Sequence, residues 1–449
     1  MNKKIITGII VVIILALIGA GVYFFYFKKP STGTPVGSAF PGEGLPVTST
    51  VDGGGIDTGT EGETFVPGGS TPLPRLYELH KLPVAGTGFS EIRNKKGVVT
   101  NTVARYIERG VGHIYETQIA TYVESRIVNE TRSRLSEALW GNNGKSVVVR
   151  YFDDNIGAIK TRILNNIGTP VADEFLSTEE LFLPDFIPFM AVAEDGADKI
   201  FYLQNSGVTS AGYVSTFKDT EVSNIFASSF TEWLPQFPNQ KLVTLTTKPS
   251  SDVPGYLFFL DTKTKVLSKV LSGINGLTTL TSRDGNRVLY AEIRNGAPEL
   301  MTYDIANKEM RSLSPQTLPE KCVWGTKEAT VVYCAVPQSL PTADYPDQWY
   351  QGLLSFSDDI WKIDTKTGIA EKILTPSELN VSSLDIINPV LSLDDTYLLF
   401  MNKVTGTPWV FRIAPDAPSV PQEATITVST PTPLAAPATS VTEGMQKVR

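Results

Sequence analysis

Histidine is scarce in this sequence, with only His80 and His113 among 449 residues. A Ser-His-Asp hydrolase needs a histidine as its general base, and the G-x-S-x-G segment of many such enzymes is absent as well. The sequence also lacks the phosphate-binding pattern G-x-x-x-x-G-K-[ST] and the H-E-x-x-H pattern of zinc enzymes. We therefore predict no catalytic residues and no cofactor, and we expect both histidines to be structural or exposed.

Cysteine is equally scarce, because Cys322 and Cys334 are the only two. Two cysteines and two distant histidines do not make a usual zinc site, so we predict no bound metal. The cysteines flank the hairpin CVWGTKEATVVYC, whose midpoint is Glu328, so a symmetric hairpin places them directly opposite each other. Outside the cytoplasm we expect such a pair to oxidise to a disulfide. Two packed free thiols are the alternative.

The sequence also has no excess of basic residues. Its 39 lysines and arginines face 47 aspartates and glutamates, which gives a formal net charge of −8. A nucleic-acid-binding protein usually carries a basic stripe that neutralises phosphates. We therefore predict that the chain has no nucleic-acid partner.

A long uncharged apolar run lies at the N-terminus, at residues 5–27, behind a short head at residues 1–4 that carries two lysines. A helix of this length spans a hydrocarbon core of about 30 Å, and tyrosines and phenylalanines crowd its C-terminal end, as in an interfacial aromatic belt. We predict a single-pass cell-membrane anchor with the head in the cytoplasm and the rest of the chain outside it. A cleaved secretion signal is the alternative.

Two segments are rich in small and turn-forming residues. Residues 28–72 are dominated by Gly, Pro and Thr, and residues 415–449 by Pro, Ala and Thr. Such compositions cannot bury enough apolar surface to fold. We predict a flexible linker and a disordered tail on either side of a folded body at residues 73–414. For the tail, a segment that binds a partner or the cell wall is the alternative.

Short strands separated by turns recur along this body. The clearest unit is Gly276–Pro315, in which apolar, partly alternating strands flank the turn Asp284-Gly285. Corresponding turns are Asn143-Gly144, Asp195-Gly196, Pro238-Asn239, Lys327-Glu328 and Asp394-Asp395, with a weaker copy near Val99. A recurrence of about 40–50 residues is typical of β-propeller blades. We predict an all-β fold, a seven-bladed β-propeller, with six or eight blades as alternatives.

The last unit begins at Asp385 and lacks a fourth strand, whereas residues 75–80 alternate like a strand without having a blade. We predict that this N-terminal strand completes the last blade and so removes the open sheet edges. Asp261, Asp304 and Asp364 each follow an apolar strand and precede a turn. We expect their carboxylates to accept backbone N–H groups and fix these turns.

The units Leu280–Ser314 and Asp358–Thr375, with a Ser-x-Asp-Gly hairpin and the turn IWKIDTKTG, resemble TolB-like and WD-repeat-like propeller blades. The segments Val103–Glu116 and Glu137–Asp154 are similar to membrane-anchored bacterial propeller proteins of uncharacterised type. The resemblance implies the propeller fold and no particular activity, because this fold hosts binding, scaffolding and hydrolytic roles alike.

One repeat is interrupted by an insertion, residues 337–357, that carries Tyr345, Trp349 and Tyr350 among prolines. Long loops with rigid aromatic side chains are frequent recognition sites. We predict that these three residues bind a partner or ligand, and the alternative is that Trp349 folds back as a cap on its own blade. Adjacent carboxylates occur at Asp153-Asp154, Glu179-Glu180 and Asp358-Asp359. Because neighbours on a strand point to opposite faces, adjacency does not indicate a catalytic carboxylate pair, and we expect these residues to be solvated turn residues.

These observations favour a non-enzymatic, membrane-anchored extracytoplasmic propeller that acts as a binding or scaffold module for an unknown protein or cell-envelope component. The alternative is an extracytoplasmic propeller enzyme, a glycosidase or lyase, with its site at the central channel. Polar, titratable side chains that converge at the channel mouth from different blades would favour the enzyme.

Overall fold

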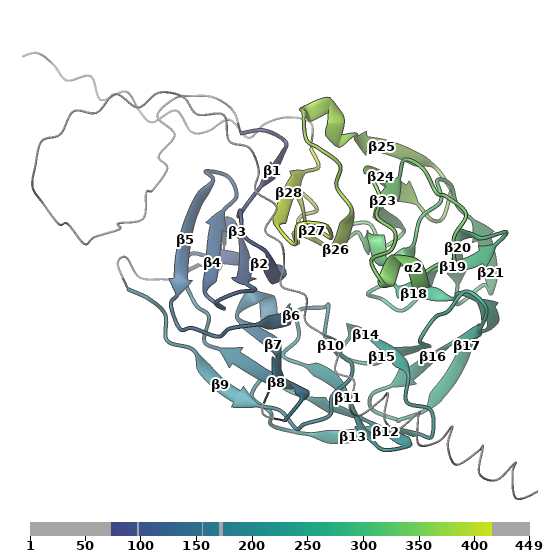
Figure 1. The fold of residues 1–449 in the computed structure, drawn as a ribbon, viewed down its shortest axis with the longest axis horizontal. Coiled ribbons are helices and arrows are strands. Elements are labelled where there is room, and N and C mark those ends of the chain that lie inside the picture. Colours follow the sequence, from purple (N-terminus) through teal and green to yellow (C-terminus); the bar gives the residue numbers. More distant parts are fainter. Residues whose placement is uncertain (1–72, 97, 155, 170–173, 415–449) are drawn as a thin grey trace, which may run out of the picture. The chain divides into compact units, whose positions relative to one another are not determined.

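The computed structural model describes residues 73–96, 98–154, 156–169 and 174–414. In this part of the chain the strands form seven four-stranded antiparallel sheets. The sheets lie around a common centre as the blades of a β-propeller (Figure 1). The predicted seven-bladed fold is therefore confirmed. The predicted head, membrane anchor, linker and tail (1–4, 5–27, 28–72 and 415–449) lie outside the described residues, and within these residues no helix is long and apolar enough to span a membrane.

We number the blades along the chain and call the four strands of each blade A to D from the centre outward. Blade 1 consists of β2 (Val84–Arg93), β3 (Val99–Glu108), β4 (Ile114–Gln118) and β5 (Val123–Val128), and blade 2 of β6 (Leu135–Gly141), β7 (Ser146–Asp153), β8 (Ala158–Asn165) and β9 (Glu179–Phe182). Blade 3 consists of β10 (Met190–Val192), β11 (Ile200–Ser206), β12 (Thr209–Ser215) and β13 (Ser223–Ser228), and blade 4 of β14 (Trp233–Asn239), β15 (Leu242–Thr247), β16 (Pro254–Asp261) and β17 (Leu267–Asn275).

Blades 5 to 7 follow the same pattern. Blade 5 consists of β18 (Thr278–Thr281), β19 (Arg287–Arg294), β20 (Ala297–Asp304) and β21 (Glu309–Ser312), and blade 6 of β22 (Cys322–Trp324), β23 (Val331–Pro337), β24 (Asp358–Asp364) and β25 (Ala370–Leu374). Blade 7 consists of β26 (Ile386–Leu391), β27 (Tyr397–Asn402), β28 (Pro408–Arg412) and β1 (Leu76–Glu78). Short helices lie in the connections, namely η1 (Asn142–Gly144), η2 (Pro319–Lys321), α2 (Asp347–Tyr350) and η3 (Pro376–Leu379).

The A–B turns are built by local side-chain hydrogen bonds. In blade 5 the Ser282 hydroxyl donates to Asp284 Oδ1 over 2.6 Å, and the Gly285 N–H donates to the Ser282 carbonyl. Blade 7 repeats this arrangement with Ser392 and Asp394 at the same 2.6 Å. Each turn contains a residue with positive φ, 73° at Gly285 in blade 5, which glycine adopts without steric cost. The same Ser-x-Asp tripeptide thus builds the A–B turns of blades 5 and 7.

The C–D turns confirm the prediction for Asp261, Asp304 and Asp364. Asp261 Oδ1 accepts the N–H groups of Lys263 and Thr264, at 3.0 and 2.6 Å. Asp304 and Asp364 accept one backbone N–H each, at 3.0 and 2.9 Å. The hydrogen bonds from the Thr264 backbone and side chain hold the pKa of Asp261 below its usual value, because they favour the charged carboxylate.

The ring closes as predicted, because β1 pairs with β28 as the fourth strand of blade 7. The register places Leu76 opposite Phe411 and Glu78 opposite Trp409. Leu76 packs into the core cluster that blades 6 and 7 share, and Leu79 packs into the cluster shared by blades 7 and 1. One short N-terminal segment thus joins two blade interfaces.

Candidate functional site

The insertion at residues 337–357 packs against the propeller, and its aromatic side chains form part of a hydrophobic cluster there. Tyr345 and Trp349 are 0% and 4% exposed and pack with Phe356 and Leu318 in one cluster. Trp349 thus acts as a cap, as in the alternative, but it covers residues of blades 5 and 7 and of the connection before blade 6 instead of its own blade. A contact of Tyr345 and Trp349 with a partner would require the loop to leave its place. Tyr350 is 41% exposed and donates a hydrogen bond to Glu320. Binding by the three residues stays a prediction, which the observed packing favours for Tyr350 alone.

A buried group of ions anchors this insertion. Lys321 Nζ lies 2.8 Å from Asp358 Oδ2 and 2.6 Å from Asp385 Oδ1, and all three side chains are 0% exposed. The indole N–H of Trp349 and the backbone N–H of Phe356 donate to Asp385. The expectation that Asp358 is a solvated turn residue is therefore wrong, because it begins β24 with its side chain inside the core.

The other two carboxylate pairs also differ from the expected solvated turn residues, because three of these four residues lie on strands. Glu179 and Glu180 belong to β9, where Glu180 pairs with Arg132 and Arg162 at 2.6 and 3.0 Å. Asp153 ends β7, and only Asp154 lies beyond that strand, paired with Arg134. Arg132 thus links the outermost strand of blade 2 to the connection that precedes the blade.

The two cysteines lie directly opposite each other in the β22–β23 pair, in the register that the hairpin midpoint predicts. They form a disulfide with a Cα–Cα distance of 4.0 Å and a sequence separation of 12. Both are buried in the core cluster shared by blades 5 and 6. The bond closes the innermost hairpin of blade 6.

The histidines have structural surroundings. His80 Nδ1 lies 2.7 Å from Glu124 Oε1, and its ring packs against Tyr106 and Tyr115 with centroid distances of 5.4 and 4.7 Å. Tyr106 also donates to Glu124, at 2.6 Å. The carbonyl of His113 accepts the N–H of Glu108.

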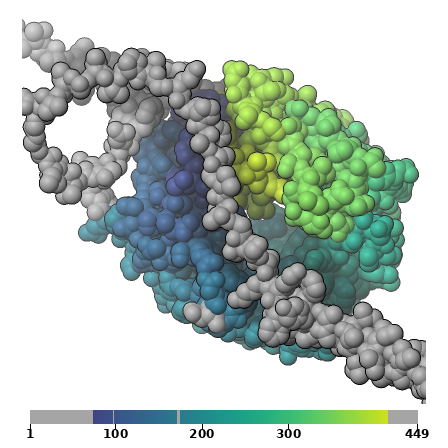
Figure 2. Space-filling view, viewed as in Figure 1, coloured from purple at the N-terminus to yellow at the C-terminus, as the bar shows by residue number. Residues whose placement is uncertain are grey.

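The central channel has a volume of about 420 Å³ and is lined by inner-strand residues of blades 1, 2, 3, 5, 6 and 7. Figure 2 shows one face of the propeller, with a hollow bordered by green and yellow segments of the chain. Glu137 in the wall is neutralised by Arg150 at 2.7 Å. Glu194 of blade 3 and Arg283 of blade 5 also line the channel, and neither forms an ion pair with another described residue.

Glu194 follows β10, and its backbone N–H donates to the carbonyl of Phe237 in blade 4. Glu194 is exposed to solvent, and it is one of the residues that line the channel. Desolvation by the channel walls raises the pKa of Glu194 from 4.5 to about 7, with a further rise from Asp195 and an opposing effect from Arg283. The group can therefore exchange a proton near neutral pH, and sequence reasoning did not identify it.

We expect the replacement Glu194→Gln to stabilise the protein only at higher pH. Because the folded-state pKa is raised, the wild type keeps its full stability below pH 4.5 and loses the contribution of this group as the pH rises through about 7. Denaturant unfolding should give equal stabilities at about pH 4 and a more stable variant at about pH 8.5. The matched control is Glu371→Gln on exposed β25, and an equal difference at both pH values would contradict the expectation.

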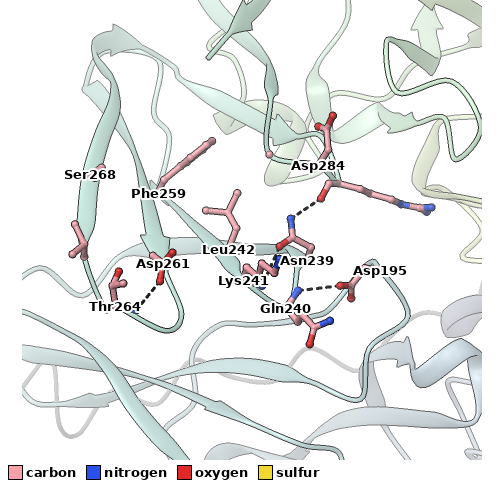
Figure 3. A pocket seen from close by; sticks show the side chains of 13 residues that line it. Asp195, Asn239, Gln240, Lys241, Leu242, Phe259, Asp261, Thr264, Ser268 and Asp284 are labelled. Carbon is pink, nitrogen blue, oxygen red and sulfur yellow. Dashed lines mark hydrogen bonds between the residues drawn. The ribbon is translucent and has the colours of Figure 1, made fainter. Parts of the chain in front are cut away.

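An open hollow of about 900 Å³ lies beside the channel, over blade 4 and the A–B turns of its neighbours (Figure 3). The turns are tied together, because the N–H of Gln240 donates to Asp195 of blade 3 at 3.1 Å and the Asn239 amide donates to the Arg283 carbonyl of blade 5 at 2.6 Å. Lys241 and Arg283 both line the hollow, and neither forms an ion pair with the residues described here. The hollow thus has two cationic residues on its frame, and the charge of Arg283 also acts on Glu194 in the channel.

No protein-family model matches the chain, and no curated protein matches it in sequence. Solved structures of similar fold include an oligogalacturonate lyase from Vibrio parahaemolyticus (10% identity, TM-score 0.48, covering 79% of this chain and 97% of the other). They also include the Pan2 WD40 domain from Neurospora crassa (12%, 0.47, 76% and 96%) and TolB from Acinetobacter baumannii (14%, 0.40, 74% and 80%). The similar structures thus include the TolB and WD40 types that the sequence resembles, and no activity carries over from them.

Proposed function

We propose that the chain is a membrane-anchored, extracytoplasmic binding module that holds a polar segment of a partner protein in the hollow over blade 4. The observation that carries the proposal is the pair of cationic residues, Lys241 and Arg283, that line a hollow of about 900 Å³ and form no ion pair with the residues described here. Its carboxylates are engaged by backbone N–H groups, as at Asp195 and Asp261. Three aspartates, Asp195, Asp261 and Asp284, also line the hollow and stay charged, because their hydrogen bonds favour the carboxylate. The partner segment therefore has to place its own carboxylate beside Lys241 and Arg283 and polar donors beside the aspartates.

The frame of the hollow supports binding without rearrangement. Hydrogen bonds connect the A–B turns of blades 3, 4 and 5 in series, through Asp195, Asn239 and the Arg283 carbonyl. Preorganised groups lose little entropy when a ligand binds. Complementary charges in a solvent-open hollow contribute mainly to the association rate and to specificity, and salt weakens them. We therefore infer a salt-sensitive interaction.

The test is capture of partners from membranes with the full-length chain as bait, in parallel with two variants. The double variant Lys241→Ala/Arg283→Ala removes both cations, and Lys366→Ala removes an exposed lysine in the C–D turn of blade 6. We expect one or more proteins to be retained by wild type and Lys366→Ala and lost with the double variant, with an affinity at least tenfold weaker, or about 1.4 kcal/mol. Identical captures by all three baits would refute the hollow as the binding site.

The anchor is supported by the apolar run at residues 5–27 and by the two lysines before it. A reporter enzyme that is active only outside the cytoplasm, fused after residue 449, should be active in cells. Activity of a cytoplasmic reporter at the same position would reverse the proposed orientation.

An enzyme at the channel is a second candidate, and one observation favours it. Glu194 from blade 3, with its pKa of about 7, and Arg283 from blade 5 line the same channel, and a group that titrates near neutral pH suits general base catalysis. In a lyase, Glu194 would remove a proton next to a carboxylate that Arg283 holds. Incubation with uronate oligosaccharides should then give an ultraviolet-absorbing unsaturated product, and Glu194→Gln should abolish it. If no product forms from a panel of uronates and glycosides, the enzyme candidate is refuted and the binding module remains.

A further inference from the structure

A buried lysine and two buried aspartates meet at the boundary between blades 6 and 7, outside the channel and the hollow. Lys321 comes from η2, Asp358 from the start of β24 and Asp385 from the residue before β26. The Lys321 nitrogen is within hydrogen-bond distance of both carboxylates, at 2.8 and 2.6 Å, and also donates to the Ile386 carbonyl at 3.0 Å. The rings of Trp349 and Phe356 lie over it, with centroid distances of 5.0 and 5.1 Å.

We propose that the side chains of Lys321 and Asp385 condense to an intramolecular isopeptide bond, with Asp358 transferring the protons. In a dry cavity charged groups tend to neutralise each other by proton transfer, because ions lose their hydration there. The transfer leaves a neutral amine, which is a nucleophile, in contact with a carboxyl group. Fixed contact of this kind replaces a bimolecular encounter, and effective concentrations for aligned groups are very high.

The surroundings of Asp385 activate its carboxyl carbon. Trp349 Nε1–H donates to Asp385 Oδ1 and Oδ2 over 3.3 and 3.2 Å, and the Phe356 N–H donates to Oδ2 over 3.2 Å. Donors fixed in this way stabilise the negative charge that develops on the carbonyl oxygen when an amine attacks. The groups that hold the insertion in place are therefore also groups that promote acyl transfer.

Asp358 is placed for the proton transfer. Its Oδ2 contacts Lys321 Nζ and accepts the Ile386 N–H over 2.7 Å, while its buried Oδ1 has no hydrogen-bond partner among the described residues. Burial also raises the pKa of Asp358 to about 6. The carboxyl group can thus take a proton from the nitrogen and release it again. Lys403, which donates to the carbonyls of Trp349 and Leu354, is the other cation near this group.

The reaction balances without another reactant. The Lys321 ammonium and the Asp385 carboxylate give an amide and one water: the Nζ–Cγ bond forms, and one Cγ–O bond breaks. Both protons lost by the nitrogen end on the leaving oxygen through Asp358, which returns to its starting state. The product links blade 6 to blade 7 next to the seam that β1 closes.

Mass spectrometry of the full-length chain tests the proposal. After reduction of the disulfide, we expect a mass lower than that of the sequence by one water. Trypsin should fail to cut after Lys321 and should release a branched peptide in which residues 312–327 are joined to residues 373–403. A full mass with normal cleavage after Lys321 would overturn the proposal.

Two variants assign the roles. Lys321→Arg keeps a buried cation but cannot form the amide, so it should have the full mass, and its peptides should separate. Asp358→Asn keeps the shape of the side chain and removes the proton carrier, so most of the purified chain should be unlinked. Loss of one water from Asp358→Asn at the wild-type extent would overturn the role of Asp358. Thermal unfolding of each variant, monitored by circular dichroism, confirms that the unlinked chains are folded.

Discussion

The variant Lys321→Met should lose about 3–5 kcal/mol of unfolding free energy at neutral pH, because it leaves two buried carboxylates without their cation. Lys321, Asp358 and Asp385 are all 0% exposed, so solvent cannot replace the lost charge. The loss is expected whether the contact of Lys321 with Asp385 is ionic or covalent. Denaturant unfolding at about pH 7.5 measures it.

The size of this loss should depend on pH. Burial already raises the pKa of Asp358 to about 6, and removal of the neighbouring cation raises it further. At about pH 5 the Asp358 carboxyl group of the variant is therefore largely protonated, and the loss should shrink. Lys366→Met, at an exposed position in the same blade, is the control and should change stability by less than about 0.5 kcal/mol. A variant as stable as the wild type at neutral pH would show that the buried charges do not need Lys321.

The second large effect is expected at the ring closure. Leu76→Ala and Leu79→Ala should each cost about 2–5 kcal/mol, because both side chains are buried and leave cavities. Their exposed fractions are 3% and 2%, and they pack into different core clusters. Because the clusters are separate, the double variant should lose about the sum of the two single losses.

Leu82 gives the matched control for these variants, since it lies just beyond the closing segment and is 50% exposed. Leu82→Ala should leave the unfolding midpoint nearly unchanged. If Leu76→Ala behaves like Leu82→Ala, the pairing of β1 with β28 does not contribute to stability, and the ring would close by blade contacts alone.

The sequence predicts the blades well because the residues that form the turns of a blade lie close together in the sequence. Turn residues such as Asp284 and Asp304 act on neighbours a few positions away, so their role is readable without the rest of the fold. The closing strand was also predictable, since the strand at residues 75–80 has no blade and the last unit has one strand too few. Cys322 and Cys334 are likewise placed by one hairpin.

Contacts between distant segments were not predictable in the same way. Lys321 and Asp385 are 64 residues apart, and no local pattern indicates that a lysine between two blades is buried. Asp358 was expected to be a solvated turn residue, because the partner that buries it, Lys321, is distant in the sequence and no local pattern shows that β24 begins at Asp358. Glu194 and Arg283 could have been identified, since both lie next to A–B turns, and in a propeller all these turns surround one mouth of the channel.

The pairing of β1 with β28 also fixes an order of events during synthesis. The first strand to be made needs a partner that is made last, since Leu76 lies opposite Phe411. At ribosomal rates of about 5–20 residues per second, the interval is roughly 20 to 70 seconds. During that time six blades can form while the seventh has no outer strand. The strand that is unpaired during this interval, β1, consists only of Leu76–Glu78. A strand this short offers little edge for pairing with another chain.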